Sequence, residues 1–171
     1  MTQNIFLIGF MGSGKSYWGR IWAKETGFTF HDLDEVIEKS LNMSVERIFE
    51  KYGEKKFREM ERDHLRKFDN TGKNLVACGG GTPCYFHNMD WMKGHGKVIY
   101  LKASPQNILE RVMDEKNKRP LLKELNTSEL LFFIEKKLGE REPFYSKADH
   151  IFNVSALDEK SLNLVPNITQ P

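Results

Sequence analysis

The chain has 171 residues, enough for one domain with its own hydrophobic core and short for two. Its 26 basic and 24 acidic side chains leave a net charge of +2, too balanced for a protein that binds nucleic acid by bulk charge. No apolar run approaches the roughly 18 residues of a membrane span, and the N-terminus lacks the features of a signal peptide. Composition therefore predicts a single globular domain with no membrane or nucleic-acid partner.

Cysteine is scarce, and its spacing carries no metal-binding pattern. Cys78 and Cys84 match no zinc motif, and no histidine pair accompanies them. We therefore expect two reduced thiols, Cys78 inside a strand, and a protein of the cytoplasm.

The first half of the chain alternates between strand and helix patterns. The apolar run Asn4–Ile8 predicts a buried parallel strand, and Tyr17–Thr26 carries apolar residues at helical spacing until Gly27 ends the helix. Thr29–His31 predicts a second strand. Further helices are expected over about 34–41, over 45–52 after an N-cap at Ser44, and from Gly53 to about Phe68.

The second half repeats this alternation. Leu75–Cys78 and Lys97–Leu101 predict the third and fourth strands, and Ser104-Pro105 supplies the cap and first turn of a helix. The charged stretch Asp114–Glu124 predicts a mobile loop. A helix over Thr127–Arg141 and a strand over His150–Val154 follow. Strands that alternate with helices predict an α/β fold, here a three-layer sandwich around a five-stranded parallel sheet.

The strongest motif lies between the first strand and the first helix. Gly9–Ser16 fits the phosphate-loop pattern G-x-x-x-x-G-K-[ST] in the context that the pattern requires. Glycines let successive backbone N–H groups point at phosphate oxygens, Lys15 reaches the β- and γ-phosphates, and Ser16 offers a hydroxyl to Mg²⁺. The loop therefore predicts ATP binding with Mg²⁺, through Gly12, Ser13, Gly14, Lys15, Ser16 and Tyr17.

Two acidic residues follow the second strand. The guanine-specific N-K-x-D motif of GTPases is absent, and the third strand ends in glycines instead of the aspartate of large ATPases. Asp32 is then the acid that holds metal-bound water beside Ser16, and Asp34 points into the cleft toward an acceptor. The alternative is a helix N-cap followed by a solvated acid.

Six motifs, in order and spacing over about residues 4–154, together resemble the shikimate kinase family. They are G-F-M-G-S-G-K-S at 9–16, D-L-D at 32–34, F-R-x-x-E at 57–61, G-G-G at 79–81, R-P-L-L at 119–122 and R-x-P-x-Y at 141–145. The resemblance implies a phosphate-loop kinase with a helical substrate-binding segment and a mobile lid. It also implies transfer of the γ-phosphate of ATP to the 3-hydroxyl of shikimate, a step of aromatic amino acid biosynthesis.

The resemblance also assigns roles. Asp34 would orient or deprotonate the attacking hydroxyl, and Arg58 and Arg141 would hold the shikimate carboxylate, for which the planar guanidinium is suited. Arg119 would reach the transferring phosphate from the lid, and Arg111 would lie along adenine. Gly80 would present its backbone N–H to the substrate. The remaining walls of the substrate pocket would be Val45, Phe49, Phe57, Glu61, Gly79, Gly81, Pro120 and Leu121. Taken singly, the arginines would be surface cations and the phenylalanines core residues; only the joint pattern favours the site.

We thus expect one kinase domain over 1–171, with a substrate-binding segment at about 33–62 and a lid at about 113–125. The polar tail 155–171 lacks the long final helix of the family, which leaves its part in the adenine site open. We expect a monomer that acts on two small molecules, ATP and shikimate. The alternatives are another small-molecule kinase of this fold, such as a gluconate or nucleoside monophosphate kinase, and a protein that binds ATP without catalysis.

Overall fold

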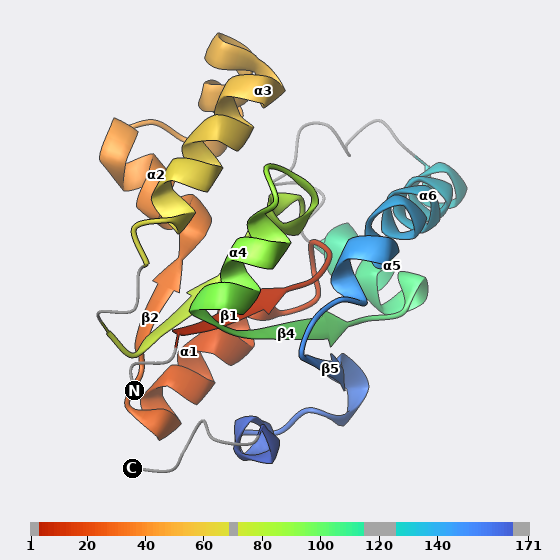
Figure 1. The fold of residues 1–171 in the computed structure, drawn as a ribbon. Coiled ribbons are helices and arrows are strands. Elements are labelled where there is room, and N and C mark those ends of the chain that lie inside the picture. The colour runs from red at the N-terminus through yellow and green to blue at the C-terminus, as the bar shows by residue number, and fades with distance from the viewer. Residues whose placement is uncertain (1–3, 69–71, 115–125, 166–171) are drawn as a thin grey trace.

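The computed structural model describes residues 4–68, 72–114 and 126–165, and its centre is a five-stranded parallel sheet (Figure 1). The strands run in the order β2-β3-β1-β4-β5, and each pairs in parallel with its neighbour. Their bounds are β1 Asn4–Ile8, β2 Thr29–Asp32, β3 Asn74–Ala77, β4 Gly96–Lys102 and β5 His150–Asn153. The predicted fold class and all five predicted strands are confirmed.

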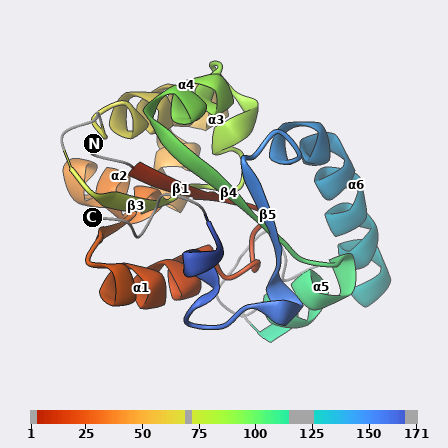
Figure 2. The same cartoon turned by 60° about the horizontal axis from the view of Figure 1, so that its bottom comes forward.

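Helices cover both faces of this sheet and extend beyond its edge. α1 packs on one face, where the segment after β5 also lies, and α4 packs on the other (Figure 2). α2 and α3 pack against each other beyond the end of β2, and α5 packs against α6 (Figure 1). The helix bounds are α1 Lys15–Thr26, α2 Leu33–Leu41, α3 Val45–Leu65, α4 Asn88–His95, α5 Pro105–Asp114 and α6 Thr127–Tyr145. No helix within the described ranges combines the length and apolarity that crossing a membrane requires.

The register of the sheet brings three loops to one edge. Ala77 of β3 lies level with Leu7 of β1 on one side and with Asp32 of β2 on the other. The strands are parallel, so the loops that leave their carboxyl ends emerge side by side. β1 also lies between β3 and β4, which is where the chain changes direction along the sheet, the usual ligand position in open α/β sheets. The predicted phosphate loop, D-L-D motif and glycine turn therefore meet at this edge.

Several element boundaries differ from the sequence expectation. Cys78 lies one residue beyond β3, and α6 continues to Tyr145 with Pro143 inside its last turn. The bounds of α3 span two helices that meet at Gly53, whose φ of 78° is not helical, so the predicted break between them is confirmed. The second of them ends at Leu65, before the expected Phe68. α4 was not predicted, because its residues show little amphipathic spacing.

The segment after β5 packs on the protein although its sequence is polar. Leu162 and Val165 are each 1% exposed and belong to the hydrophobic core. The indole N–H of Trp22 in α1 donates to the carbonyl of Asp158 at 3.0 Å. The sequence here lacks the pattern of a long final helix, and the structure has two short 3-10 turns instead, Val154–Ala156 and Ser161–Leu164. The hydrogen bond from Trp22 holds the stretch between these turns against α1.

This packing predicts that the segment stabilises the fold. Leu162→Ala should lower the free energy of unfolding by about 2–3 kcal/mol, because it removes a fully buried side chain and leaves a cavity. Leu164→Ala is the matched control, since Leu164 is 73% exposed and its loss should cost at most about 0.5 kcal/mol. Urea denaturation of both variants measures the difference. Equal stabilities would mean that the segment does not pack as described.

Candidate active site

The phosphate loop has the backbone shape that anion binding requires. Gly9 has a φ of 146°, and a Cβ there would lie 2.6 Å from the carbonyl oxygen of Leu101, so no other residue fits. Gly14 is the N-cap of α1 in the left-handed region, with a φ of 89°. No described side chain caps this helix, so its first N–H groups are available to a phosphate at the positive end of the helix dipole.

Lys15 lies at the floor of the loop. Its ammonium donates to the carbonyl oxygens of Gly9 at 2.8 Å and of Phe10 at 2.9 Å. Burial lowers the pKa of Lys15 to about 8, although the nearby carboxylates of Asp34 and Asp32 oppose this shift. A desolvated cation held by its own loop interacts strongly with any anion that enters the cavity.

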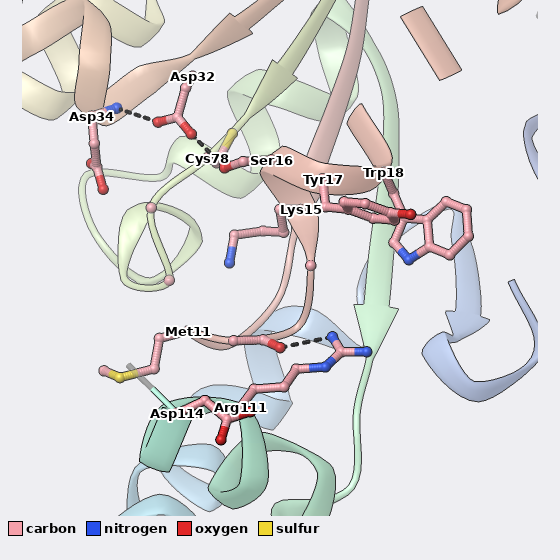
Figure 3. Close-up of a pocket in the computed structure, with 14 residues that line it drawn as sticks. Met11, Lys15, Ser16, Tyr17, Trp18, Asp32, Asp34, Cys78, Arg111 and Asp114 are labelled. Atoms are coloured by element: carbon pink, nitrogen blue, oxygen red, sulfur yellow. Dashed lines mark hydrogen bonds between the residues drawn. The ribbon is translucent and has the colours of Figure 1, made fainter. Parts of the chain in front are cut away.

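Ser16 and Asp32 form the predicted pair. The Ser16 hydroxyl donates to Oδ2 of Asp32 at 2.5 Å, while Oδ1 of Asp32 accepts from the backbone N–H of Asp34 at 3.1 Å (Figure 3). Asp32 is therefore both the N-cap of α2 and the partner of Ser16, so the two interpretations of this acid are compatible. No cluster of three metal-ligating side chains exists among the described residues. One hydroxyl backed by one carboxylate fits Mg²⁺ that takes its other oxygen ligands from nucleotide and water.

Asp34 points into the same cavity as Lys15 (Figure 3). Burial raises the pKa of the Asp34 carboxyl to about 6, and the neighbouring carboxylates of Asp32 and Glu61 raise it further, against the attraction of Lys15. A carboxylate with this pKa is mostly ionised at neutral pH and is a better proton acceptor than an ordinary aspartate.

The glycine turn Gly79–Gly81 is where the side chains from distant elements meet. None of the three glycines has a positive φ, so the reason for glycine is space. A Cβ on the first would lie 2.6 Å from Oε1 of Glu61, and one on the second would lie 2.9 Å from Nη1 of Arg141. One on the third would lie 2.6 Å from Nη2 of Arg58. The turn thus brings Arg58, from α3, and Arg141, from α6, against one short stretch of backbone.

Arg58 is buried, contrary to the surface position that its basic neighbours alone would suggest. Its Nη1 donates to Oε2 of Glu61 at 2.8 Å, and Glu61 is fully buried. Thr82 donates a short hydrogen bond to the other carboxylate oxygen of Glu61. The rings of Tyr85 and Phe57 lie 4.7 and 5.3 Å from the Arg58 guanidinium carbon. Arg58 is therefore fixed in direction by an ion pair and by aromatic faces.

Tyr145 fixes the glycine turn from α6, a position to which the sequence reasoning gave no role. Its buried hydroxyl donates to the carbonyl of Gly80 at 2.6 Å. Arg141, one helical turn earlier, lies with its guanidinium carbon 5.2 Å from the Phe10 ring. The R-x-P-x-Y motif contained both residues, so the signal was present, but the motif alone did not show that its tyrosine faces the turn.

The cavity at this edge measures about 600 Å³. The predicted site residues that line it are Gly12, Gly14, Lys15, Ser16, Tyr17, Asp32, Asp34, Gly79, Gly80 and Arg111. Met11, Trp18, Cys78 and Asp114, to which no role was assigned, line it as well. Of the other predicted wall residues, Phe49 and Phe57 contact each other beside Arg58, and Val45 packs against the core. The predicted Arg119, Pro120 and Leu121 lie outside the described residues.

Comparison with known proteins points to one family. A family model described as shikimate kinase matches residues 11–168. A shikimate kinase of Phocaeicola vulgatus is 41% identical over 160 residues, which cover 94% of this chain and 91% of that protein. The crystal structure of a shikimate kinase from Bacteroides thetaiotaomicron has a TM-score of 0.87 and 36% identity, and the match covers 91% of this chain and 89% of the other.

Two further solved structures differ in how closely they resemble this chain. A shikimate kinase from Acinetobacter baumannii, solved in complex with shikimate, has a TM-score of 0.82 and 32% identity over 96% of this chain and 90% of that one. A gluconokinase from Sinorhizobium meliloti has a TM-score of 0.56 at 15% identity, over 98% of this chain and 90% of the other. That last likeness shows a shared fold alone.

The raised pKa of Asp34 makes a prediction about stability. A carboxyl with a folded pKa of about 6, above its usual 3.8, costs no stability below pH 3.8, because both states are then protonated. The cost grows as the pH rises from 3.8 to about 6 and stays constant above that. Asparagine imitates the protonated form. The free energy of unfolding of Asp34→Asn should therefore be about 1–3 kcal/mol higher than that of the native protein at pH 7.5.

Urea denaturation between pH 5 and 8 measures this gain, which should shrink toward the acid end. Asp63→Asn is the control, because the Asp63 side chain is 58% exposed on α3. A gain of the same size at every pH would show that burial of the ionised Asp34 is not its cause.

Proposed function

Because the chain belongs to the shikimate kinase family, we infer that it transfers the γ-phosphate of ATP to the 3-hydroxyl of shikimate. The observation that carries the proposal is the meeting of Asp34, Arg58 and Arg141 around the glycine turn, next to Lys15. The two arginines suit a carboxylate, and Asp34, which lines the cavity of the phosphate loop, suits a hydroxyl. Shikimate carries both groups on one small ring.

The phosphate loop would bind and orient ATP. Phosphoryl transfer has a loose transition state with charge spread over the equatorial oxygens, so positioning and electrostatics supply most of the catalysis. Lys15 would leave its loop carbonyls for the β- and γ-phosphates. Ser16 would hold Mg²⁺, with Asp32 accepting from its hydroxyl or from a metal-bound water. The ion, when bound, neutralises charge between the β- and γ-phosphates.

Asp34 would act on the acceptor. With a pKa of about 6, its carboxylate is ionised at neutral pH and accepts the proton of the attacking 3-hydroxyl as the bond to phosphorus forms. Its carboxyl group lines the cavity that Lys15 also lines and is partly desolvated there. We assign it the roles of orienting residue and general base.

The two arginines would hold the other end of the ring. Arg58 is held by Glu61 through Nη1 and by Glu54 through Nη2, at 2.8 and 3.3 Å, and its guanidinium lies against Gly81 of the glycine turn. Arg141 reaches the same turn from α6. The Gly80 N–H would contact the substrate where a side chain would block its approach. Phe49 and Phe57, with Val45, Pro120 and Leu121, would complete the apolar wall.

We propose one domain over 1–171 that acts as a monomer in the cytoplasm, since a single chain contributes every group named above. Within it, residues 33–62 bind shikimate, which fits the placement of Asp34 and Arg58 on α2 and α3. Residues 113–125 form the lid, from which Arg119 would neutralise the transferring phosphate. Arg111 would lie along the adenine.

The proposed reaction has a direct test. ADP release from ATP and Mg²⁺ should depend on shikimate and should be far slower with gluconate or with a nucleoside monophosphate at equal concentration. Lys15→Met should abolish the shikimate-dependent rate, because it removes the charge aimed at the γ-phosphate. A coupled assay measures the rate. Faster turnover of gluconate than of shikimate would refute the assignment of the acceptor.

The assignment of Arg58 to the carboxylate predicts a coupling between enzyme and substrate. Arg58→Ala should lower kcat/KM for shikimate by roughly 30- to 1000-fold, because one partner of a buried charge pair is lost. Shikimate methyl ester, which lacks the negative charge, should be a poor substrate of the native enzyme. Its kcat/KM should fall much less in the Arg58→Ala variant than the kcat/KM of shikimate does. Arg62→Ala is the control, since Arg62 lies on the same helix but pairs with Asp63 at the surface. A coupling near zero would remove Arg58 from the carboxylate site.

A further inference from the structure

Trp18 lies one helical turn into α1 and lines the same cavity as Lys15, yet none of the phosphate-binding chemistry uses it. We propose that Trp18 is a base-binding residue: its indole ring forms one wall of the site for the adenine of ATP, opposite the guanidinium of Arg111. The proposal rests on ATP binding at Gly9–Ser16 and adds what recognises the base.

Arg111 and Trp18 flank one point of the phosphate loop. Nη1 of Arg111 donates to the carbonyl of Gly12 at 2.9 Å, which holds the guanidinium beside the loop. A Cβ built on Gly14 would lie 3.2 Å from that nitrogen and 3.3 Å from Cδ1 of Trp18. The two side chains therefore approach Gly14 from different elements, α5 and α1. Figure 3 shows the indole nitrogen on the side of the ring that faces Arg111.

Trp18 is held in this orientation by other aromatic rings. It stacks on Trp22, with centroids 5.7 Å apart and planes at 27°, and the edge of Tyr17 meets it at 5.2 Å. Trp22 is fully buried, and its indole N–H donates to the carbonyl of Asp158. Trp22 is thus a positioning residue, through which the segment after β5 supports the cavity wall.

The chemistry of this wall suits a flat heteroaromatic base. The indole ring offers a stacking surface or edge and an N–H donor, and a guanidinium stacks readily on aromatic rings. A triphosphate alone would gain nothing from the indole, because phosphate oxygens are held by backbone N–H groups and Lys15. The ligand class is therefore a nucleotide with an aromatic base, and the loss of Trp18 should weaken binding of the base and leave binding of the phosphates unchanged.

The test compares one ligand that has a base with one that does not. Calorimetry would measure the binding of ADP and of inorganic tripolyphosphate to the native protein, to Trp18→Leu and to Trp91→Leu. Trp91 is the matched control, because it lies in α4, on the opposite face of the sheet from α1. It packs there against Phe6 of β1 and His95 of α4. Trp18→Leu should weaken ADP binding by roughly 5- to 50-fold and leave tripolyphosphate binding nearly unchanged. Trp91→Leu should change neither.

Equal weakening of both ligands by Trp18→Leu would overturn the proposal, since the residue would then only support the loop. If that variant fails to fold, tryptophan fluorescence decides: ADP should quench the native emission and tripolyphosphate should not, and Trp18→Phe should lose the quenching. Quenching that survives in Trp18→Phe also refutes the proposal. These outcomes do not depend on the acceptor, so the absence of shikimate-dependent turnover would refute the proposed function and leave this result standing.

Discussion

The buried ion pair between Arg58 and Glu61 is the constraint on which the acceptor side of the site depends. Glu61 is fully buried, and a buried carboxylate is tolerated only when its lone pairs are satisfied. Arg58 and Thr82 satisfy them from α3 and from the turn after β3. This pair leaves no room for a side chain at Gly79 or Gly81, and Arg141 leaves none at Gly80, so the charged groups around the turn account for its three glycines. The same turn is then free to approach a substrate closely.

The groups that would do the chemistry are held at a cost to stability. Burial lowers the pKa of Lys15 and raises that of Asp34, so both charged forms are less stable here than in water. The two side chains line one cavity, and the attraction between their opposite charges partly offsets the desolvation penalty of each. An ATP phosphate and a substrate hydroxyl would replace the lost solvation. The site is therefore electrostatically incomplete without its ligands, which is the condition for tight and oriented binding.

How far the sequence could predict this protein differs from residue to residue. The roles expected of Lys15 and Ser16 followed from a contiguous eight-residue motif, whose backbone shape is fixed locally by glycine. Arg58 was different: among so many neighbouring charges, its burial to 8% exposure could be inferred only from resemblance. The motif that contains Tyr145 did not show its contact with Gly80, which lies 65 residues earlier in the sequence. Trp18 was passed over because its place opposite Arg111 of α5 depends on how distant elements pack. Leu162 was hidden in a polar tail for the same reason.

The sequence by itself determined the alternation of strands and helices, the phosphate loop and the family, since these depend on local spacing and on the residue types that phosphate binding demands. The tertiary structure decided the rest. Strand order placed β1 between β3 and β4 and so brought three loops to one edge. Helix packing carried Arg141 and Tyr145 to a turn some 60 residues earlier. Such contacts between distant segments arise because apolar faces are buried against one another. A sequence pattern shows that a face must be buried, but it does not show which other face covers it.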